Sequence, residues 1–168
     1  MFLLRVVAPL ASLFFFSAFA VAQVSAANCT LETWDWTFNS LGQTPCTVAA
    51  YMMATCHGGH YRLPPLSTGG TYLGNRSNNL CHCNTVSYSL LSACSACKGE
   101  GWLSWFDYVT NCNNTMPPSS FPNPVPLGIR VPQWALLDVT RYFGIPMNRM
   151  PSVTLQSSGL ARFSAPQE

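Results

Sequence analysis

Four of the eight cysteines fall within one stretch, Cys81 to Gly99, that also has the spacing of a helix. Residues three or four positions apart form an apolar face there: Cys83, Val86, Leu90, Cys94 and Cys97. Asn84 is the expected N-cap, and Lys98 with Gly99 is the expected end. A helix whose buried face carries cysteines should be cross-linked to its neighbours, so we expect the fold to be built around this stretch.

The other four cysteines lie outside this stretch: Cys29, Cys46, Cys56 and Cys112. An even number in a chain sent to an oxidising compartment predicts four disulfides, with 105 possible connectivities. Cys46 and Cys56 lie on one predicted helix about 15 Å apart, so they cannot pair with each other. Cys94 and Cys97 could form a redox pair or half of a zinc site, but structural bridging is the favoured interpretation.

Residues 1–26 have the pattern of a secretory signal peptide. A single arginine precedes an apolar run from Val6 to Ala22, and small residues follow it. We expect cleavage after Ala26, with Ala22 as the alternative site. An uncleaved membrane anchor remains the alternative to secretion, because the run approaches the length that spans a bilayer.

Only 8% of the residues are charged and the formal net charge is +2, which argues against nucleic-acid binding. Three sequons predict surface glycosylation at Asn28, Asn75 and Asn113. The size after cleavage is that of a single domain, and we expect a monomer without a membrane span in the mature chain.

We predict a mainly α fold, a small disulfide-stabilised bundle of three to four short helices with long Pro/Gly-rich loops. The domain spans residues 27–142, and residues 143–168 form a flexible C-terminal tail. A first helix lies within residues 39–58, with Thr44 and Pro45 as its expected start. An earlier start at Asn39 or Ser40 would make Pro45 a kink.

A long loop follows over residues 57–80. Four of its apolar residues could attach it to the helices: Leu63, Leu66, Tyr72 and Leu73. A further helix is expected over residues 101–112, and its apolar face would carry Trp102, Trp105, Val109 and Cys112. The proline-rich residues 116–132 should be extended, and a short fourth helix is expected from Pro132.

Residues 27–38 are too short for a domain and should form an arm pinned by one disulfide. Their side chains Trp34 and Trp36 are predicted to cover the core. The alternative is an exposed aromatic lip that binds a partner.

No catalytic residue, metal site or cofactor is predicted. His57, His60 and His82 could gather copper or zinc, but no acidic residues support such a site. Asp35 or Asp107 could serve a glycosidase in a cleft, although no catalytic motif accompanies them.

The order Thr44-Pro45-Cys46, Cys81-x-Cys83, Cys94, Cys97 and Cys112 resembles the eight-cysteine CFEM domains of fungal surface proteins. Four departures are clear. No cysteine lies three residues after Cys46, Cys29 is an additional cysteine, and the gap before Cys81 is too long. Asn78, Asn79 and Leu80 stand where haem-binding members carry an aspartate. Haem binding is therefore not carried over to this chain.

A second resemblance covers roughly residues 36 to 142 and is to an uncharacterised group of basidiomycete fungal proteins. The similar segments are FNSLGQTPC, VAAY, CHCNTVSYSLLSACSAC, a tryptophan-rich helix ending in NC, and VPQWALLDVT. The resemblance implies an extracellular domain, in relatives often followed by one transmembrane helix, and no activity.

We therefore expect a secreted or cell-surface, non-catalytic domain that binds an extracellular ligand or cell-wall component. The alternatives are a small secreted enzyme acting on wall polysaccharide and a secreted effector.

Overall fold

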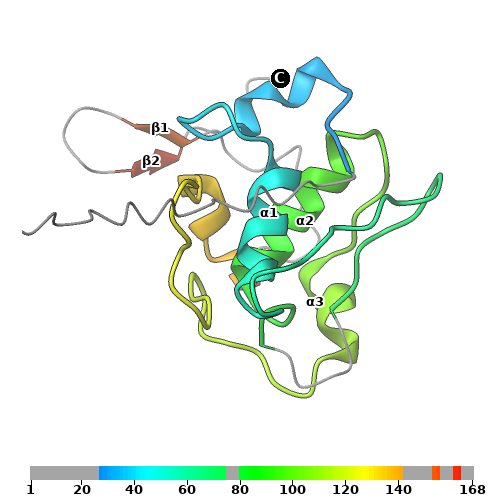
Figure 1. The fold of residues 1–168 in the computed structure, drawn as a ribbon, viewed down its shortest axis with the longest axis vertical. Coiled ribbons are helices and arrows are strands. Elements are labelled where there is room, and N and C mark those ends of the chain that lie inside the picture. The colour runs from blue at the N-terminus through cyan, green and yellow to red at the C-terminus, as the bar shows by residue number, and fades with distance from the viewer. Residues whose placement is uncertain (1–26, 75–79, 142–152, 156–160, 164–168) are drawn as a thin grey trace, which may run out of the picture.

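The fold is mainly helical and is organised around one central helix, α2 (Thr85–Ala96), in the computed structural model of the chain. The structure describes residues 27–74, 80–141, 153–155 and 161–163, so the predicted signal peptide and the Asn75 sequon lie outside the described residues. Figure 1 shows α1 (Pro45–Ala54) beside α2 at the centre of the molecule.

The remaining elements are short. They are the 3-10 helix η1 (Glu32–Thr37), the one-turn helix α3 (Trp105–Tyr108), and the 3-10 helices η2 (Val109–Asn111), η3 (Gln133–Leu136) and η4 (Val139–Arg141). Two three-residue strands, β1 (Val153–Leu155) and β2 (Ala161–Phe163), pair antiparallel with Thr154 opposite Arg162. Both strands lie within residues 143–168, where a flexible tail is predicted, and the rest of that segment lies outside the described residues.

The central helix is buried on every side, whereas the sequence predicted one buried face. All twelve of its residues are buried, including four serines. Small side chains let neighbours approach closely, and α1, η1, η3, η4 and α3 all pack against it. The predicted cap is confirmed, because the Asn84 side chain accepts a hydrogen bond from the Ser87 N–H at 2.8 Å.

All eight cysteines form disulfides, and every disulfide has one end in the stretch Cys81 to Gly99. The pairs are Cys29–Cys97, Cys46–Cys94, Cys56–Cys81 and Cys83–Cys112. The central stretch is thus joined to the N-terminal arm, to both ends of α1 and to the segment after α3. The prediction that Cys46 and Cys56 have different partners is confirmed.

The helix boundaries confirm one prediction and correct another. The first helix begins at Pro45 after the N-cap Thr44, as one of the two alternatives predicted. The third is shorter than expected, because Ser104 caps it at 3.2 Å from the Asp107 nitrogen. Trp102 therefore lies before α3, and the buried face of that helix is formed by Trp105 and Tyr108.

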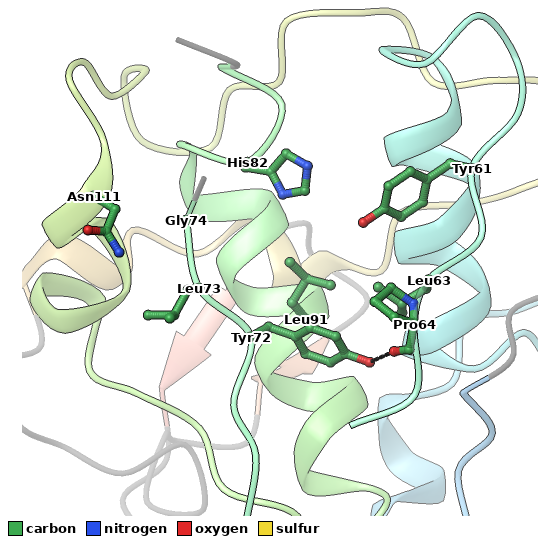
Figure 2. Close-up of a pocket in the computed structure, with 9 residues that line it drawn as sticks. All are labelled: Tyr61, Leu63, Pro64, Tyr72, Leu73, Gly74, His82, Leu91 and Asn111. Carbon is green, nitrogen blue, oxygen red and sulfur yellow. Dashed lines mark hydrogen bonds between the residues drawn. The ribbon is translucent and has the colours of Figure 1, made fainter. Parts of the chain in front are cut away.

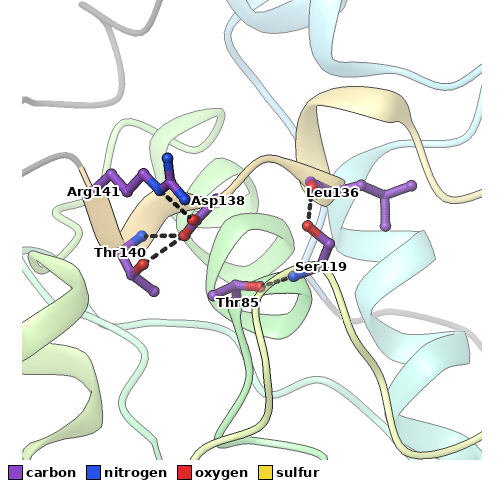
Figure 3. A network of polar contacts seen from close by, with 6 residues as sticks. All are labelled: Thr85, Ser119, Leu136, Asp138, Thr140 and Arg141. Atoms are coloured by element: carbon purple, nitrogen blue, oxygen red, sulfur yellow. Dashed lines mark hydrogen bonds and ion pairs between the residues drawn. The ribbon is translucent and has the colours of Figure 1, made fainter.

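The extended proline-rich segment is attached to the start of α2 by polar contacts (Figure 3). Thr85 accepts a hydrogen bond from the Ser119 N–H at 2.9 Å, and the Ser119 hydroxyl donates to the Leu136 carbonyl at 2.6 Å. Asp138 then holds η4 by accepting from Thr140 and from Arg141, the latter at 3.0 Å. The expected fourth helix is therefore a pair of 3-10 turns fixed by local bonds.

Candidate functional sites

A cavity of about 430 Å³ lies between the loop that follows α1 and the central helix (Figure 2). We call it the loop cavity. Its lining residues are Tyr61, Leu63, Pro64, Tyr72, Leu73, Gly74, His82, Leu91 and Asn111. The lining carries no aspartate, glutamate, lysine or arginine, which makes it an uncharged and largely apolar site.

Two disulfides frame the loop cavity. Cys56–Cys81 closes the loop that supplies most of its wall, and Cys83–Cys112 holds the chain next to Asn111. Inside the loop, the Tyr72 hydroxyl donates to the Pro64 carbonyl at 2.8 Å. Leu63 is buried in the hydrophobic core and Tyr72 packs against it, which confirms that these two residues attach the loop to the helices. The same expectation is wrong for Leu73, which is 49% exposed.

The loop contacts α3 and the segment after it at Gly74, where only a residue without a side chain fits. The Gly74 N–H donates to the Tyr108 carbonyl at 3.0 Å. A Cβ at this position would lie 2.7 Å from the Cys112 sulfur and 2.8 Å from the Tyr108 carbonyl oxygen. The missing side chain is therefore what allows this wall of the cavity to close.

The rings of Tyr61 and His82 form the polar end of the cavity, and His57 lies next to them outside the lining. The ring centroid of Tyr61 lies 4.8 Å from that of His57 and 6.2 Å from that of His82. Burial, and secondarily the charge of His57, lower the pKa of His82 below its ordinary value. Burial raises the pKa of Tyr61, and burial together with Tyr61 raises that of Tyr72 to about 12. At neutral pH this end of the cavity therefore offers uncharged hydrogen-bonding groups.

The histidines considered as metal ligands are only partly brought together. The rings of His57 and His82 have centroids 6.0 Å apart, and His60 makes no ring contact with either of them. In the described part of the chain, the one cluster with ligand atoms close enough for a metal ion is Cys29, Cys46 and Cys97. Their sulfurs are in disulfides and so are not thiolate ligands.

A continuous chain of ring contacts joins four tryptophans from three parts of the sequence, and we call it the tryptophan row. Its order is Trp102, Trp34, Trp36, Trp134, with successive centroid distances of 6.0, 5.8 and 6.3 Å. Trp36 is 57% exposed, and the other three are partly exposed. The prediction of core cover is thus right for Trp34, which packs against the core, and wrong for Trp36.

The N-terminal arm holds the centre of the row in place. Cys29 is joined to Cys97, and the N–H groups of Thr30 and Leu31 both donate to the Cys97 carbonyl. At the far end of the row, the Trp134 indole N–H donates to the Thr37 carbonyl at 3.2 Å. The row therefore depends on contacts between segments that are far apart in sequence.

Two of the acidic residues, Asp107 and Glu100, accept structural hydrogen bonds. Asp107 accepts a hydrogen bond from Ser104, and Glu100 accepts one from the Gly69 N–H at 2.6 Å. Glu32 and Asp35 are exposed on η1, three residues apart and hence along one edge of the 3-10 helix. No acid lines the loop cavity, so neither Asp35 nor Asp107 lies in it as the enzyme alternative would require.

Comparisons with protein-family models, with curated proteins and with solved structures found no match.

Within the described ranges, no helix is long and apolar enough to cross a membrane. The four disulfides fit a protein of an oxidising, extracellular environment. Of the predicted glycosylation sites, Asn28 and Asn113 are exposed.

The sequence did not predict the loop cavity, and it did not predict that Trp134 belongs to the tryptophan row. The available signals were a long loop between two cysteines, which often marks a functional segment, and a tryptophan within the helix predicted from Pro132. Neither signal indicated which residues would meet.

Proposed function

We propose that this chain is a secreted or cell-surface, non-catalytic domain that binds a wall polysaccharide through the tryptophan row. The observation that carries the proposal is the row itself, because it is aromatic, partly exposed and continuous. Folded proteins rarely leave large adjoining apolar side chains exposed without a partner for them.

The chemistry of the row favours a carbohydrate over a charged ligand. The face of an indole ring is electron-rich, and it attracts the polarised C–H groups on the flat face of a sugar ring. Glu32 and Asp35 lie on the same short helix as Trp34 and Trp36, where their carboxylates can accept hydrogen bonds from sugar hydroxyls. A scarcity of charge over the whole chain agrees with a neutral ligand.

Three further features support an extracellular location. Residues 1–26 have the pattern of a signal peptide, the cysteines are all paired, and two exposed asparagines lie in sequons. The resemblance to basidiomycete extracellular domains points the same way.

The test is binding of the secreted, oxidised chain to insoluble chitin, β-1,3-glucan, cellulose and mannan, with product release measured in the same samples. Trp36→Ala should weaken binding roughly tenfold or more, as expected for an exposed aromatic anchor. The matched control is Leu127→Ala, because Leu127 is 98% exposed on the proline-rich segment outside the row.

Saturable binding without products, lost in Trp36→Ala and kept in Leu127→Ala, would support the proposal. Binding to none of the polysaccharides would refute it. Product release that is abolished by Asp35→Asn or Asp107→Asn would show an enzyme instead.

A further inference from the structure

We propose that the loop cavity is a second binding site, for a small neutral aromatic molecule that carries one hydrogen-bonding group of the phenol type. The proposal is independent of the tryptophan row, since the row and the cavity share no lining residue.

The size and the absence of charge define the class of ligand first. A volume of about 430 Å³ falls within the range of small-molecule pockets. A charged ligand would lose its hydration and find no opposite charge in the lining, which is unfavourable. The polar side chains of the lining are neutral near pH 7, so a neutral ligand is the one that they match.

The shape of the lining favours a ring. Figure 2 shows Leu63 and Leu91 on one side of the space, with the Tyr72 ring beside them and the Tyr61 hydroxyl and His82 imidazole at the other end. Leucine side chains can cover the face of a planar molecule, while tyrosine rings give stacked or edge-on contacts. A saturated ring of equal size would gain only the burial of its apolar surface.

One polar group on the ligand would lie at the end formed by Tyr61 and His82. The neutral imidazole of His82 has one nitrogen that donates and one that accepts. A ligand hydroxyl at this end can therefore form a hydrogen bond in either direction.

The cavity is also held open before any ligand arrives. Cys56–Cys81 and Cys83–Cys112 fix its frame, and the bonds from Tyr72 to Pro64 and from Gly74 to Tyr108 fix its wall. A preformed site has little ordering cost on binding, so even a small molecule can bind measurably.

The experiment is an NMR titration of the oxidised chain with 4-methylphenol, read at the His82 ring protons and the Leu91 methyl groups. We expect saturable shifts of these signals with a Kd of about 1 mM or tighter. The His60 ring protons are the internal reference, because His60 does not line the cavity and should not shift.

Two related probes test the ligand class. 4-Methylcyclohexanol has the same substituents on a saturated ring and should bind several-fold more weakly. Benzoate carries a charge and should not shift the signals. Equal binding of the saturated probe would refute the aromatic preference, and comparable binding of benzoate would refute the preference for a neutral ligand.

A pair of matched variants tests the location. Leu73 is 49% exposed at the rim, so Leu73→Trp should fill the opening and weaken 4-methylphenol binding about tenfold or more. Leu127→Trp makes the same change on another exposed leucine and should leave binding unchanged. Unchanged 4-methylphenol binding in Leu73→Trp would overturn the proposal. Signal shifts in the wild-type chain that do not include His82 and Leu91 would also overturn it, and this measurement does not depend on the folding of either variant.

Discussion

The tryptophan row and the loop cavity are both aromatic, but the structure holds them in different ways. The row lies open on the surface, and its central residues belong to an arm joined to the rest of the molecule by one disulfide, Cys29–Cys97. The cavity is framed by two disulfides and a buried tyrosine. The first arrangement suits a large ligand that contacts a surface, and the second suits a small ligand that enters an open pocket.

The comparison also shows how the central helix serves both regions. Its C-terminal end, through Cys97, anchors the arm with the row, and its N-terminal side, through Cys81 and Cys83, anchors the cavity. If the two ends act independently, a change at one end should leave the other region intact. Of the three further predictions, the first two test this independence and the third concerns the cavity side alone.

The largest effect is expected from removing the disulfide that holds the arm. Cys29→Ser with Cys97→Ser should lower the free energy of unfolding by about 2–4 kcal/mol, because a cross-link over 68 residues would no longer restrict the unfolded chain. Denaturant unfolding measures this loss. Binding to polysaccharide should weaken, while the NMR signals of His82 and Leu91 should stay in place.

As a control, the double variant is purified without a reducing agent and its free thiols are counted. The absence of free thiols shows that the other three disulfides are intact. Equal disturbance of the cavity signals and of the row would contradict the independence of the two ends.

A smaller effect is expected from Tyr108→Phe, which acts on the cavity side. Tyr108 is fully buried and its hydroxyl donates to the His82 carbonyl at 2.7 Å. Removing the hydroxyl leaves that partly buried carbonyl without this donor, so stability should fall by about 1–3 kcal/mol. Denaturant unfolding measures the loss, and the His82 signals should shift.

Tyr72→Phe is the matched control, because its hydroxyl also donates to a carbonyl but at an exposed position where water can replace it. A loss of stability as large as that of Tyr108→Phe would show that burial is not the reason for the difference. Polysaccharide binding should be unchanged in both variants.

The smallest effect is expected from acidification. The pKa of His82 is lower in the folded chain than its ordinary value of about 6.5, so the unfolded chain takes up the proton first as the pH falls. The part of the free energy of unfolding that depends on a neutral His82 imidazole is fully present above the ordinary pKa of about 6.5. It is lost as the pH falls through the lower folded-state pKa of His82. The midpoint of denaturant unfolding should therefore decrease between pH 7 and pH 5.

His82→Gln removes this group while keeping a polar side chain, so its midpoint should change less over the same pH interval. An identical pH dependence in the variant and in the wild-type chain would mean that His82 is not the group responsible.

The sequence alone determined the elements with strong local signals. Thr44 before Pro45 and Asn84 before a helical pattern are capping arrangements that act within one turn, and both were predicted. The requirement that Cys46 and Cys56 have separate partners follows from helix geometry alone, and it is confirmed. Each of these depends on residues a few positions apart.

Only the tertiary structure decided which disulfides form, that α2 is buried all round, and which aromatic residues meet. Spacing along a helix shows one stripe of apolar residues but does not reveal that serines on the other faces are covered as well. Trp134 lies 32 residues after Trp102, and both reach the row only through the arm that carries Trp34 and Trp36. Contacts of this kind depend on how chain segments pack, and packing is a property of the whole core rather than of any local pattern.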